Sequence, residues 1–152
     1  MSPGRIRATV VADKALVVER MLAGVATLPL ATEAEFQADS RMVAAGESFL
    51  RRGLEALFDV GRHVLAKGFA DPAADYKSIA QRLGERSVLD ASQVECLRAM
   101  AGYRNRLVHF YDEVTPAELY DILTEHIGDL REILAAYRAW IAAHPERIDE
   151  SL

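Results

Sequence analysis

The chain has 152 residues, the size of one folded domain. Its 51% hydrophobic and 27% charged residues exclude a disordered or fibrous protein, and its net charge of −5 argues against the uniformly basic surface of a general nucleic-acid coater. A single cysteine, Cys96, excludes an intramolecular disulfide and a zinc site built from several cysteines. No apolar run reaches the ~18 residues of a membrane span, and charged residues interrupt the N-terminal apolar segment where a signal peptide needs a continuous core. We therefore expect a single cytoplasmic domain over residues 1–152.

Apolar residues recur with helical spacing along most of the chain. The first predicted helix covers residues 5–26. A second begins after Thr32, which forms a capping box with Glu35, and its pattern continues to Lys67, with Gly68 as the residue that ends the helix. The second helix also contains three glycines. They indicate either a bend or a close helix–helix contact, which we favour, or a break into two helices: Gly46, Gly53 and Gly61.

The rest of the chain contains several residues that are typical of the beginnings and ends of helices. A short helix is predicted over residues 76–83, ending at Gly84, and Asp90 is a good N-cap for a helix that continues to about Val108. The strongest local signal covers residues 115–118, with an N-cap threonine, proline at the first helical position and glutamate at the third. One apolar stripe then runs to residues 144–145, where His-Pro ends it. The sequence therefore predicts an all-α bundle of four long helices and one short helix.

The stretch 103–111 carries the most chemistry. On an ideal helix Arg104 shares a face with apolar residues on either side of it, among them Leu97, Ala101 and Val108. A guanidinium cannot lose its proton to escape burial, so it needs a carboxylate, a phosphate or a water-filled cleft. Such a local inconsistency often marks a functional site.

Asn105 and His109 are four residues apart, so they are neighbours on the next face, and Asn105 can orient the imidazole. Arg104 and His109 are about 140° apart on an ideal helix. They can converge on one ligand if the helix ends near Val108, or if a second copy of the chain completes the site. The alternative is a buried ion pair for Arg104 and a helix-terminal cap for His109.

The pattern Arg-Asn-x-x-x-His-x-Tyr, at Arg104, Asn105, His109 and Tyr111, resembles the signature of the HepT-like toxins of the HEPN superfamily. Four further segments resemble the same family: 54–63, 76–84, 100–103 and 114–120. The resemblance covers roughly residues 45–141, whereas the first 40 residues fit the family only in being helical. The expected fold is therefore a HEPN-type bundle.

The resemblance implies a metal-independent endoribonuclease toxin, without a cofactor, that acts on RNA as a homodimer. Arg104 and His109 would then be the catalytic pair, with Asn105 as a supporting polar residue. The resemblance also implies a toxin–antitoxin system in which a minimal nucleotidyltransferase antitoxin transfers AMP to Tyr111. The alternative is a catalytically silent HEPN module that binds such a nucleotidyltransferase or a nucleotide.

Asp59 shares a helix face with Arg52 and His63. It is either part of a solvated polar stripe or a supporting residue that holds Arg104 or His109 in place across the bundle. Several arginines are candidates for a local basic lining, although most can equally lie on solvated helix faces: Arg51, Arg52, Arg62, Arg98, Arg104 and Arg106.

Overall fold

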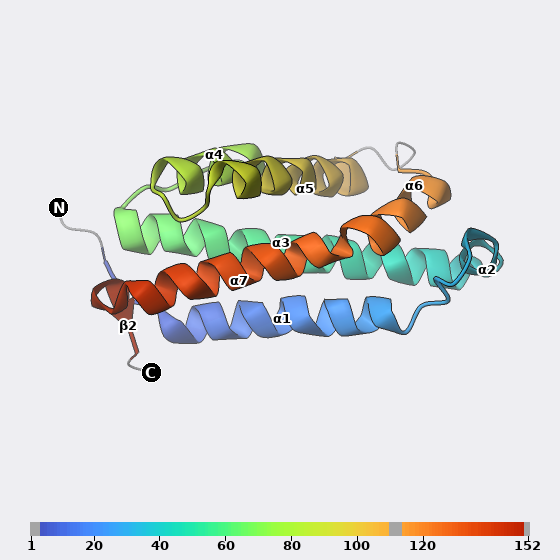
Figure 1. Ribbon diagram of the computed structural model, residues 1–152, viewed down its shortest axis with the longest axis horizontal. Coiled ribbons are helices and arrows are strands. Elements are labelled where there is room, and N and C mark those ends of the chain that lie inside the picture. Colours follow the sequence, from blue (N-terminus) through green and yellow to red (C-terminus); the bar gives the residue numbers. More distant parts are fainter. Residues whose placement is uncertain (1–3, 110–113, 151–152) are drawn as a thin grey trace.

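The computed structural model describes residues 4–109 and 114–150 as a bundle of helices (Figure 1). The long helices are α1 (Ala8–Ala26), α3 (Ser40–Phe69), α5 (Ala91–His109) and α7 (Ile127–Ala143), and α4 (Tyr76–Glu85) is the predicted short one. The central helix, α3, packs against α1 and α7 on one side and against the layer of α4 and α5 on the other. The predicted all-α bundle is therefore confirmed. Within the described part of the chain, no helix is long and apolar enough to cross a membrane.

The N-terminal end differs from the predicted helix over residues 5–26. Residues Ile6–Arg7 form a short strand, β1, which pairs in parallel with β2 (Ile148–Asp149) at the left end of Figure 1. The Arg7 backbone N–H donates to Nε2 of His63, 2.9 Å away. Ile6 is fully buried against Gly68, where an added Cβ would lie 2.9 Å from the isoleucine Cδ1. These long-range contacts hold the segment extended, so α1 begins only at Ala8.

The predicted second helix is broken, but not at its glycines. Thr32 caps a separate short helix, α2 (Glu33–Gln37), by accepting from the Glu35 N–H at 3.1 Å. Asp39 then caps α3 by accepting from the Arg41 N–H at 2.9 Å. At its other end α3 passes through Gly68, the predicted end, to Phe69, and Ala70 ends the helix in the left-handed conformation (φ 51°). The chain is therefore broken where Asp39 caps a new helix, and not at a glycine.

The three internal glycines of α3 allow neighbouring helices to approach closely, as we favoured. An added Cβ at Gly46 would lie 2.8 Å from Leu123, and one at Gly53 would lie 3.4 Å from both Met21 and Leu130. At Gly61 the added atom would lie 2.8 Å from the Tyr137 hydroxyl. The close-contact interpretation is confirmed, and α3 is continuous over 30 residues.

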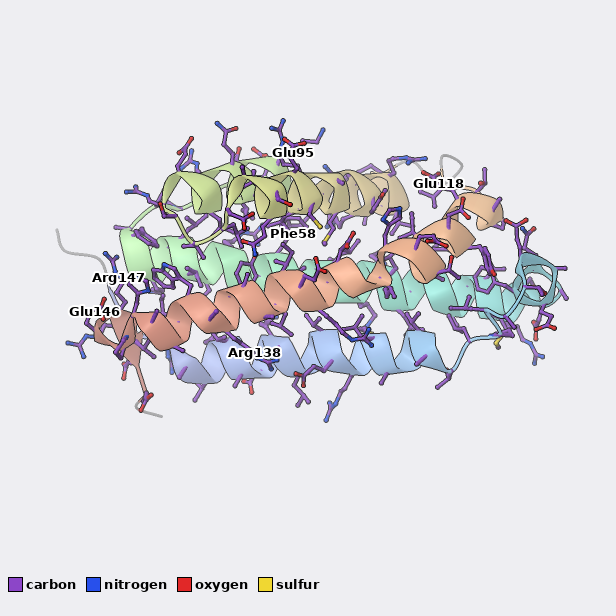
Figure 2. All side chains as sticks on the ribbon, viewed as in Figure 1. Phe58, Glu95, Glu118, Arg138, Glu146 and Arg147 are labelled. Atoms are coloured by element: carbon purple, nitrogen blue, oxygen red, sulfur yellow. The ribbon has the colours of Figure 1, made fainter. Side chains whose placement is uncertain are left out.

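The hairpin of α4 and α5 follows the predicted caps closely. The Asp75 side chain accepts from the Ser78 N–H at 2.8 Å and begins α4, which continues to Glu85, two residues beyond the predicted end. Asp90 accepts from the Gln93 N–H at 2.8 Å ahead of α5. The side chain of Phe58, on α3, lies beneath this hairpin (Figure 2), with its ring centroid 4.7 Å from that of Tyr76.

The C-terminal helix is interrupted. Thr115 accepts from the Glu118 N–H at 3.1 Å and begins α6 (Pro116–Asp121), as predicted. A π-helical turn, η1 (Ile122–His126), then separates α6 from α7. There the Thr124 hydroxyl donates to the Tyr120 carbonyl at 2.8 Å, a bond that bends helices. Pro145 begins a short 3-10 turn, η2 (Pro145–Arg147), so the predicted stop at residues 144–145 is confirmed.

Candidate functional site

The expected site residues surround a cavity of about 270 Å³ where the end of α5 passes the start of α4. The last turns of α5 supply Arg104, Asn105 and His109, and α3 supplies Arg62. Asp75 and Tyr76 close the cavity from the beginning of α4, together with Ala74.

Arg104 is the central group of this cavity. Its Cζ atom lies 4.4 Å from the centroid of the Tyr76 ring, a distance typical of a cation–π contact. Its Nε atom is buried and has no hydrogen-bond partner, and no carboxylate among the described residues pairs with it. The guanidinium on the apolar helix face is therefore held by an aromatic ring and not by the buried ion pair that we considered as the alternative.

His109 lies at the exposed C-terminal end of α5 and lines the same cavity as Arg104 within one chain. The described part of α5 extends to His109, one residue beyond the predicted end, and the two side chains line one cavity although an ideal helix separates them by about 140°. Asn105 lines the cavity between them, although no hydrogen bond joins Asn105 to His109 in the described structure. Tyr111 lies outside the described residues.

The position of Tyr76 follows from local helix chemistry. The Asp75 carboxylate accepts from both the N–H and the hydroxyl of Ser78, and these hydrogen bonds lower the pKa of Asp75. Tyr76 is thereby fixed as the first residue of α4, with its ring packed against Phe58 of α3. A second guanidinium, that of Arg62, lies over the same ring with its Cζ atom 5.6 Å from the centroid.

Asp59, the predicted supporting residue, pairs with other groups. Its carboxylate lies 3.1 Å from Lys14 Nζ on α1 and 3.5 Å from Nη1 of Arg62. Among the described residues, its link to Arg104 runs through Arg62 and the Tyr76 ring that both arginines share. Its place is therefore the edge of the site, one arginine away from the predicted catalytic pair.

An ion pair fastens the last turn of α5 to the first turn of α6. The Arg106 guanidinium donates to both carboxylate oxygens of Glu118, at 2.6 and 2.7 Å, and lowers the pKa of Glu118. Because Glu118 sits in a turn already capped by Thr115, the pair joins two ordered helix ends. It therefore restrains the turn that carries His109.

Two other side chains that sequence analysis singled out lie outside the cavity. Nε2 of His63 accepts the hydrogen bond from β1, and burial lowers the pKa of this imidazole. Cys96 is half-buried between α5 and α7, where burial raises the pKa of its thiol to about 11. Among residues 4–109 and 114–150, no three His, Cys, Asp or Glu side chains are placed to hold a metal ion.

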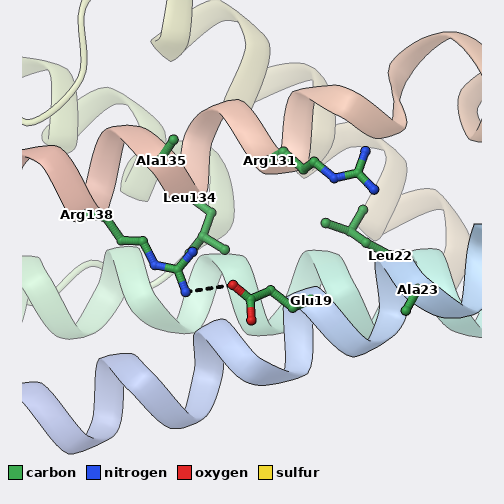
Figure 3. Close-up of a pocket in the computed structure, with 7 residues that line it drawn as sticks. All are labelled: Glu19, Leu22, Ala23, Arg131, Leu134, Ala135 and Arg138. Carbon is green, nitrogen blue, oxygen red and sulfur yellow. Dashed lines mark hydrogen bonds and ion pairs between the residues drawn. The ribbon is translucent and has the colours of Figure 1, made fainter.

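A larger hollow of about 510 Å³ lies between α1 and α7, on a different face of the bundle (Figure 3). Its floor is apolar, and Glu19 and Arg138 form an ion pair of 2.8 Å across it. It contains none of the predicted site residues and no histidine or tyrosine that can move a proton. The smaller cavity at Arg104 is therefore the better candidate for chemistry.

The groups around the Arg104 cavity have complementary chemical roles. A guanidinium can bind phosphate oxygens through its fork and stabilise negative charge as it develops. An imidazole can take up or release a proton near neutral pH. The cavity thus combines groups suited to reactions of phosphate esters.

Comparisons with known proteins agree with this geometry. The fold is that of HEPN toxins: a tri-AMPylated HEPN toxin of Shewanella oneidensis, in complex with an MNT antitoxin, superimposes with a TM-score of 0.77 at 18% identity, over 86% of this chain and 97% of that one. The model of the family described as "ribonuclease HepT-like" matches residues 22–137. The chain belongs to the HepT-like family. The match begins within α1, so the family resemblance extends further towards the N-terminus than residue 45.

Two further structures share the fold. A toxin–antitoxin structure with AMP-PNP matches with a TM-score of 0.78 at 17% identity, over 86% of this chain and 98% of that one. YutE, a cytosolic protein of unknown function from Bacillus subtilis, matches with a TM-score of 0.71 at 20% identity, over 88% and 90% of the two chains. No match to a curated protein was found.

Sequence analysis gave Tyr76 no role and counted Arg62 only among six candidate basic residues. One local signal was available, because an aspartate directly before Tyr76 caps α4 and fixes the tyrosine at the helix start. The other signals are tertiary. Only the packing of α3 against the α4–α5 hairpin brings Arg62 and Arg104 to one ring.

Proposed function

We propose that the chain is an endoribonuclease toxin that cleaves RNA without a metal ion, with Arg104 and His109 as its catalytic pair. The observation that carries this proposal is the Arg104 guanidinium, which has no described carboxylate partner and lies in one cavity with Asn105 and His109. A cation held in this way is available for a phosphate.

In the proposed reaction the ribose 2′-oxygen attacks the adjacent phosphorus. The bond from phosphorus to the 5′-oxygen of the next nucleotide breaks, leaving a 2′,3′-cyclic phosphate and a 5′-hydroxyl. His109 moves the protons between these oxygens, and Arg104 stabilises the charge on the non-bridging oxygens. Asn105, between the two, supports them by contacting the phosphate or the imidazole.

The test uses RNA cleavage in the presence of a metal chelator, with analysis of the product ends. We expect cyclic phosphate and 5′-hydroxyl ends from the wild-type chain, and no cleavage by folded His109→Ala or Arg104→Ala. Because no described carboxylate pairs with Arg104, its removal should leave the circular dichroism spectrum intact. Full activity of folded His109→Ala would refute the catalytic assignment, and the silent binding module would then be the better description.

We further propose that a nucleotidyltransferase antitoxin neutralises the chain by transferring AMP to Tyr111, two residues after His109. The AMP-modified toxin in complex with its MNT antitoxin, which shares this fold, supports the idea. The added phosphodiester would repel RNA phosphates near the cavity, and the adenosine would obstruct them. Tyr111→Phe should stay toxic but escape neutralisation, and intact-mass spectrometry should show AMP only on the native chain. An unchanged mass gain in Tyr111→Phe would place the modification elsewhere.

We also propose that the chain acts in the cytoplasm and that it forms a homodimer with α5 in the interface. A dimer would place the cavity of each chain beside a second basic surface and form a cleft for an RNA strand. Light scattering at micromolar concentration should give the mass of two chains. A strict monomer that still cleaves RNA would contradict the dimer.

A further inference from the structure

The Tyr76 ring carries two arginines from different helices. The Cζ atom of Arg104, on α5, is 4.4 Å from the ring centroid, and that of Arg62, on α3, is 5.6 Å away. The two guanidinium carbons are therefore at most about 10 Å apart, the sum of these distances. Both side chains line the cavity that also contains Asn105 and His109.

The charge of this pair is only partly balanced. Arg62 has a long ion pair of 3.5 Å with Asp59, and the same carboxylate lies closer, at 3.1 Å, to Lys14. Asp75 is the one carboxylate among the described lining residues, and its oxygens already accept two hydrogen bonds from Ser78. The cavity wall therefore presents more positive than negative charge to a ligand, in a chain whose net charge is −5.

A cation–π contact uses none of the N–H donors of the guanidinium as hydrogen-bond donors. The terminal N–H donors can therefore still bind a second partner. The planar fork of arginine matches two oxygens of a phosphate. Because a polynucleotide carries a phosphate at every nucleotide, two guanidiniums this close can face one strand.

We propose that Arg62 and Arg104 form a two-arginine subsite for the backbone phosphates of a single RNA strand, and that Tyr76 is the positioning residue that holds both guanidiniums. This inference rests on the proposed ribonuclease function and adds a binding residue, Arg62, that supplies affinity beside the reacting phosphate. Arg62 contributes charge that binds substrate and transition state alike, so it should act on KM and not on kcat.

The chain offers a closely matched control. The Cζ atom of Arg86 lies 5.4 Å from the centroid of Phe69, and its side chain pairs with Asp71 at 3.5 Å. Arg86 is 45% exposed and Arg62 is 41% exposed. Arg86 follows the far end of α4 and does not line the cavity. Arg86→Gln therefore removes the same kind of ring contact and ion pair as Arg62→Gln, away from the proposed subsite.

The binding test uses the full chain with His109→Ala, so that the probe is not cut, and a short fluorescein-labelled single-stranded RNA of mixed sequence. Anisotropy is measured over a range of salt concentrations. Arg62→Gln should weaken binding about tenfold, and it should reduce the slope of log K against log salt by about 0.7, the value for one phosphate contact on a single strand. Arg62→Lys should keep the slope, and Arg86→Gln should match the reference.

The kinetic test uses the chain with His109 intact. Arg62→Gln should raise KM about tenfold and leave kcat within about twofold. Tyr76→Phe keeps the ring, so it should retain more of kcat than Tyr76→Leu does. Tyr76→Leu removes the ring that holds Arg104, so kcat should fall while the salt slope, which reports charge, stays the same. Circular dichroism excludes unfolded variants from the comparison.

The two proposals fail in different ways. If Arg62→Gln binds RNA with the affinity and salt slope of the reference while His109→Ala abolishes cleavage, the subsite is wrong and the ribonuclease stands. An equal loss in Arg86→Gln would also overturn the subsite, because the effect would then be one of general charge. If the wild-type chain cuts no RNA, the proposed function is wrong, and the binding measurements still decide whether Arg62 contacts the strand.

Discussion

The hydroxyl of Tyr137 is an unpaired polar group in the core, and removing it should stabilise the protein. Tyr137 is fully buried, its hydroxyl has no hydrogen-bond partner, and burial raises the pKa of the phenol. A buried hydroxyl without a partner costs about 1–3 kcal/mol. Tyr137→Phe keeps the ring and removes that cost, so we expect the free energy of unfolding to rise by about 1 kcal/mol, or about 2–4 °C in Tm.

A second substitution checks the same contact from the other side. Gly61→Ala gains up to about 1 kcal/mol of helix propensity, but its Cβ would lie 2.8 Å from the Tyr137 hydroxyl, 3.0 Å from Leu83 and 3.1 Å from Ile79. Overpacking of this kind costs about 1–3 kcal/mol, so we expect a net loss of about 1 kcal/mol. In the Tyr137→Phe background the shortest of these contacts is absent. The loss should therefore shrink by about 0.5 kcal/mol or more, a coupling expected for residues in contact.

The assay is urea denaturation of the four proteins of this cycle, followed by circular dichroism. A loss of stability of more than about 1 kcal/mol in Tyr137→Phe would refute the reasoning, because it would mean that the hydroxyl has a partner such as a buried water. Additive changes in the free energy of unfolding would show that the hydroxyl and the added methyl do not meet. Gly61 also faces α4, which begins with Tyr76, so Gly61→Ala should lower RNA cleavage more than Tyr137→Phe does.

Three further predictions concern the fold around the site. The pKa of His63 is lowered from 6.5 in the folded protein, so the unfolded chain binds the proton more readily. Tm should therefore fall as the pH drops through 6.5, and it should fall less in His63→Gln. The pKa of Glu118 is lowered by Arg106, so the contribution of this ion pair to stability is lost as the pH falls below 4.5. Because both side chains are about one third exposed, Glu118→Gln should lower the free energy of unfolding by no more than about 1 kcal/mol at neutral pH, measured by urea denaturation. Thr115→Ala removes an N-cap and should cost about 1 kcal/mol by the same measurement, whereas a neutral result would show that Pro116 alone sets the helix start.

The parts of the fold that sequence predicted correctly are those decided by neighbouring residues. Thr32, Asp90 and Thr115 each satisfy a backbone N–H three positions ahead, and the structure has all three caps. The break before α3 was missed because the apolar pattern continues across it, although Asp39 is itself a good cap. The pairing of β1 with β2 joins residues 142 positions apart in the register Ile6 to Ile148, which no local pattern can report.

The site also combines features that local sequence predicts with features that depend on helix packing. Arg104 was predicted from a conflict within one helix, a cation on an apolar face, and the structure places it without a described carboxylate partner. The Tyr76 ring that holds Arg104 comes from α4, and the second arginine over this ring, Arg62, comes from α3. Asp59 was predicted either to belong to a solvated polar stripe or to hold Arg104 or His109 in place across the bundle. Of its actual partners, Lys14 depends on how α1 packs on α3, whereas Arg62 is three residues ahead on α3 itself.

The meeting of Arg104 and His109 within one chain gives a decisive test of how a homodimer would work. If each cavity uses its own pair, a dimer of one Arg104→Ala chain and one His109→Ala chain has no intact pair. If the pair were shared across a two-fold axis, the mixed dimer would have one intact site out of two. Random mixing makes about half of the dimers mixed, so a shared pair would restore about a quarter of the wild-type activity. Because both side chains line one cavity, we expect co-refolded mixtures of the two inactive variants to stay inactive. Recovery near a quarter would refute the single-chain pair, and the second protomer would then supply a catalytic residue instead of only enclosing the RNA.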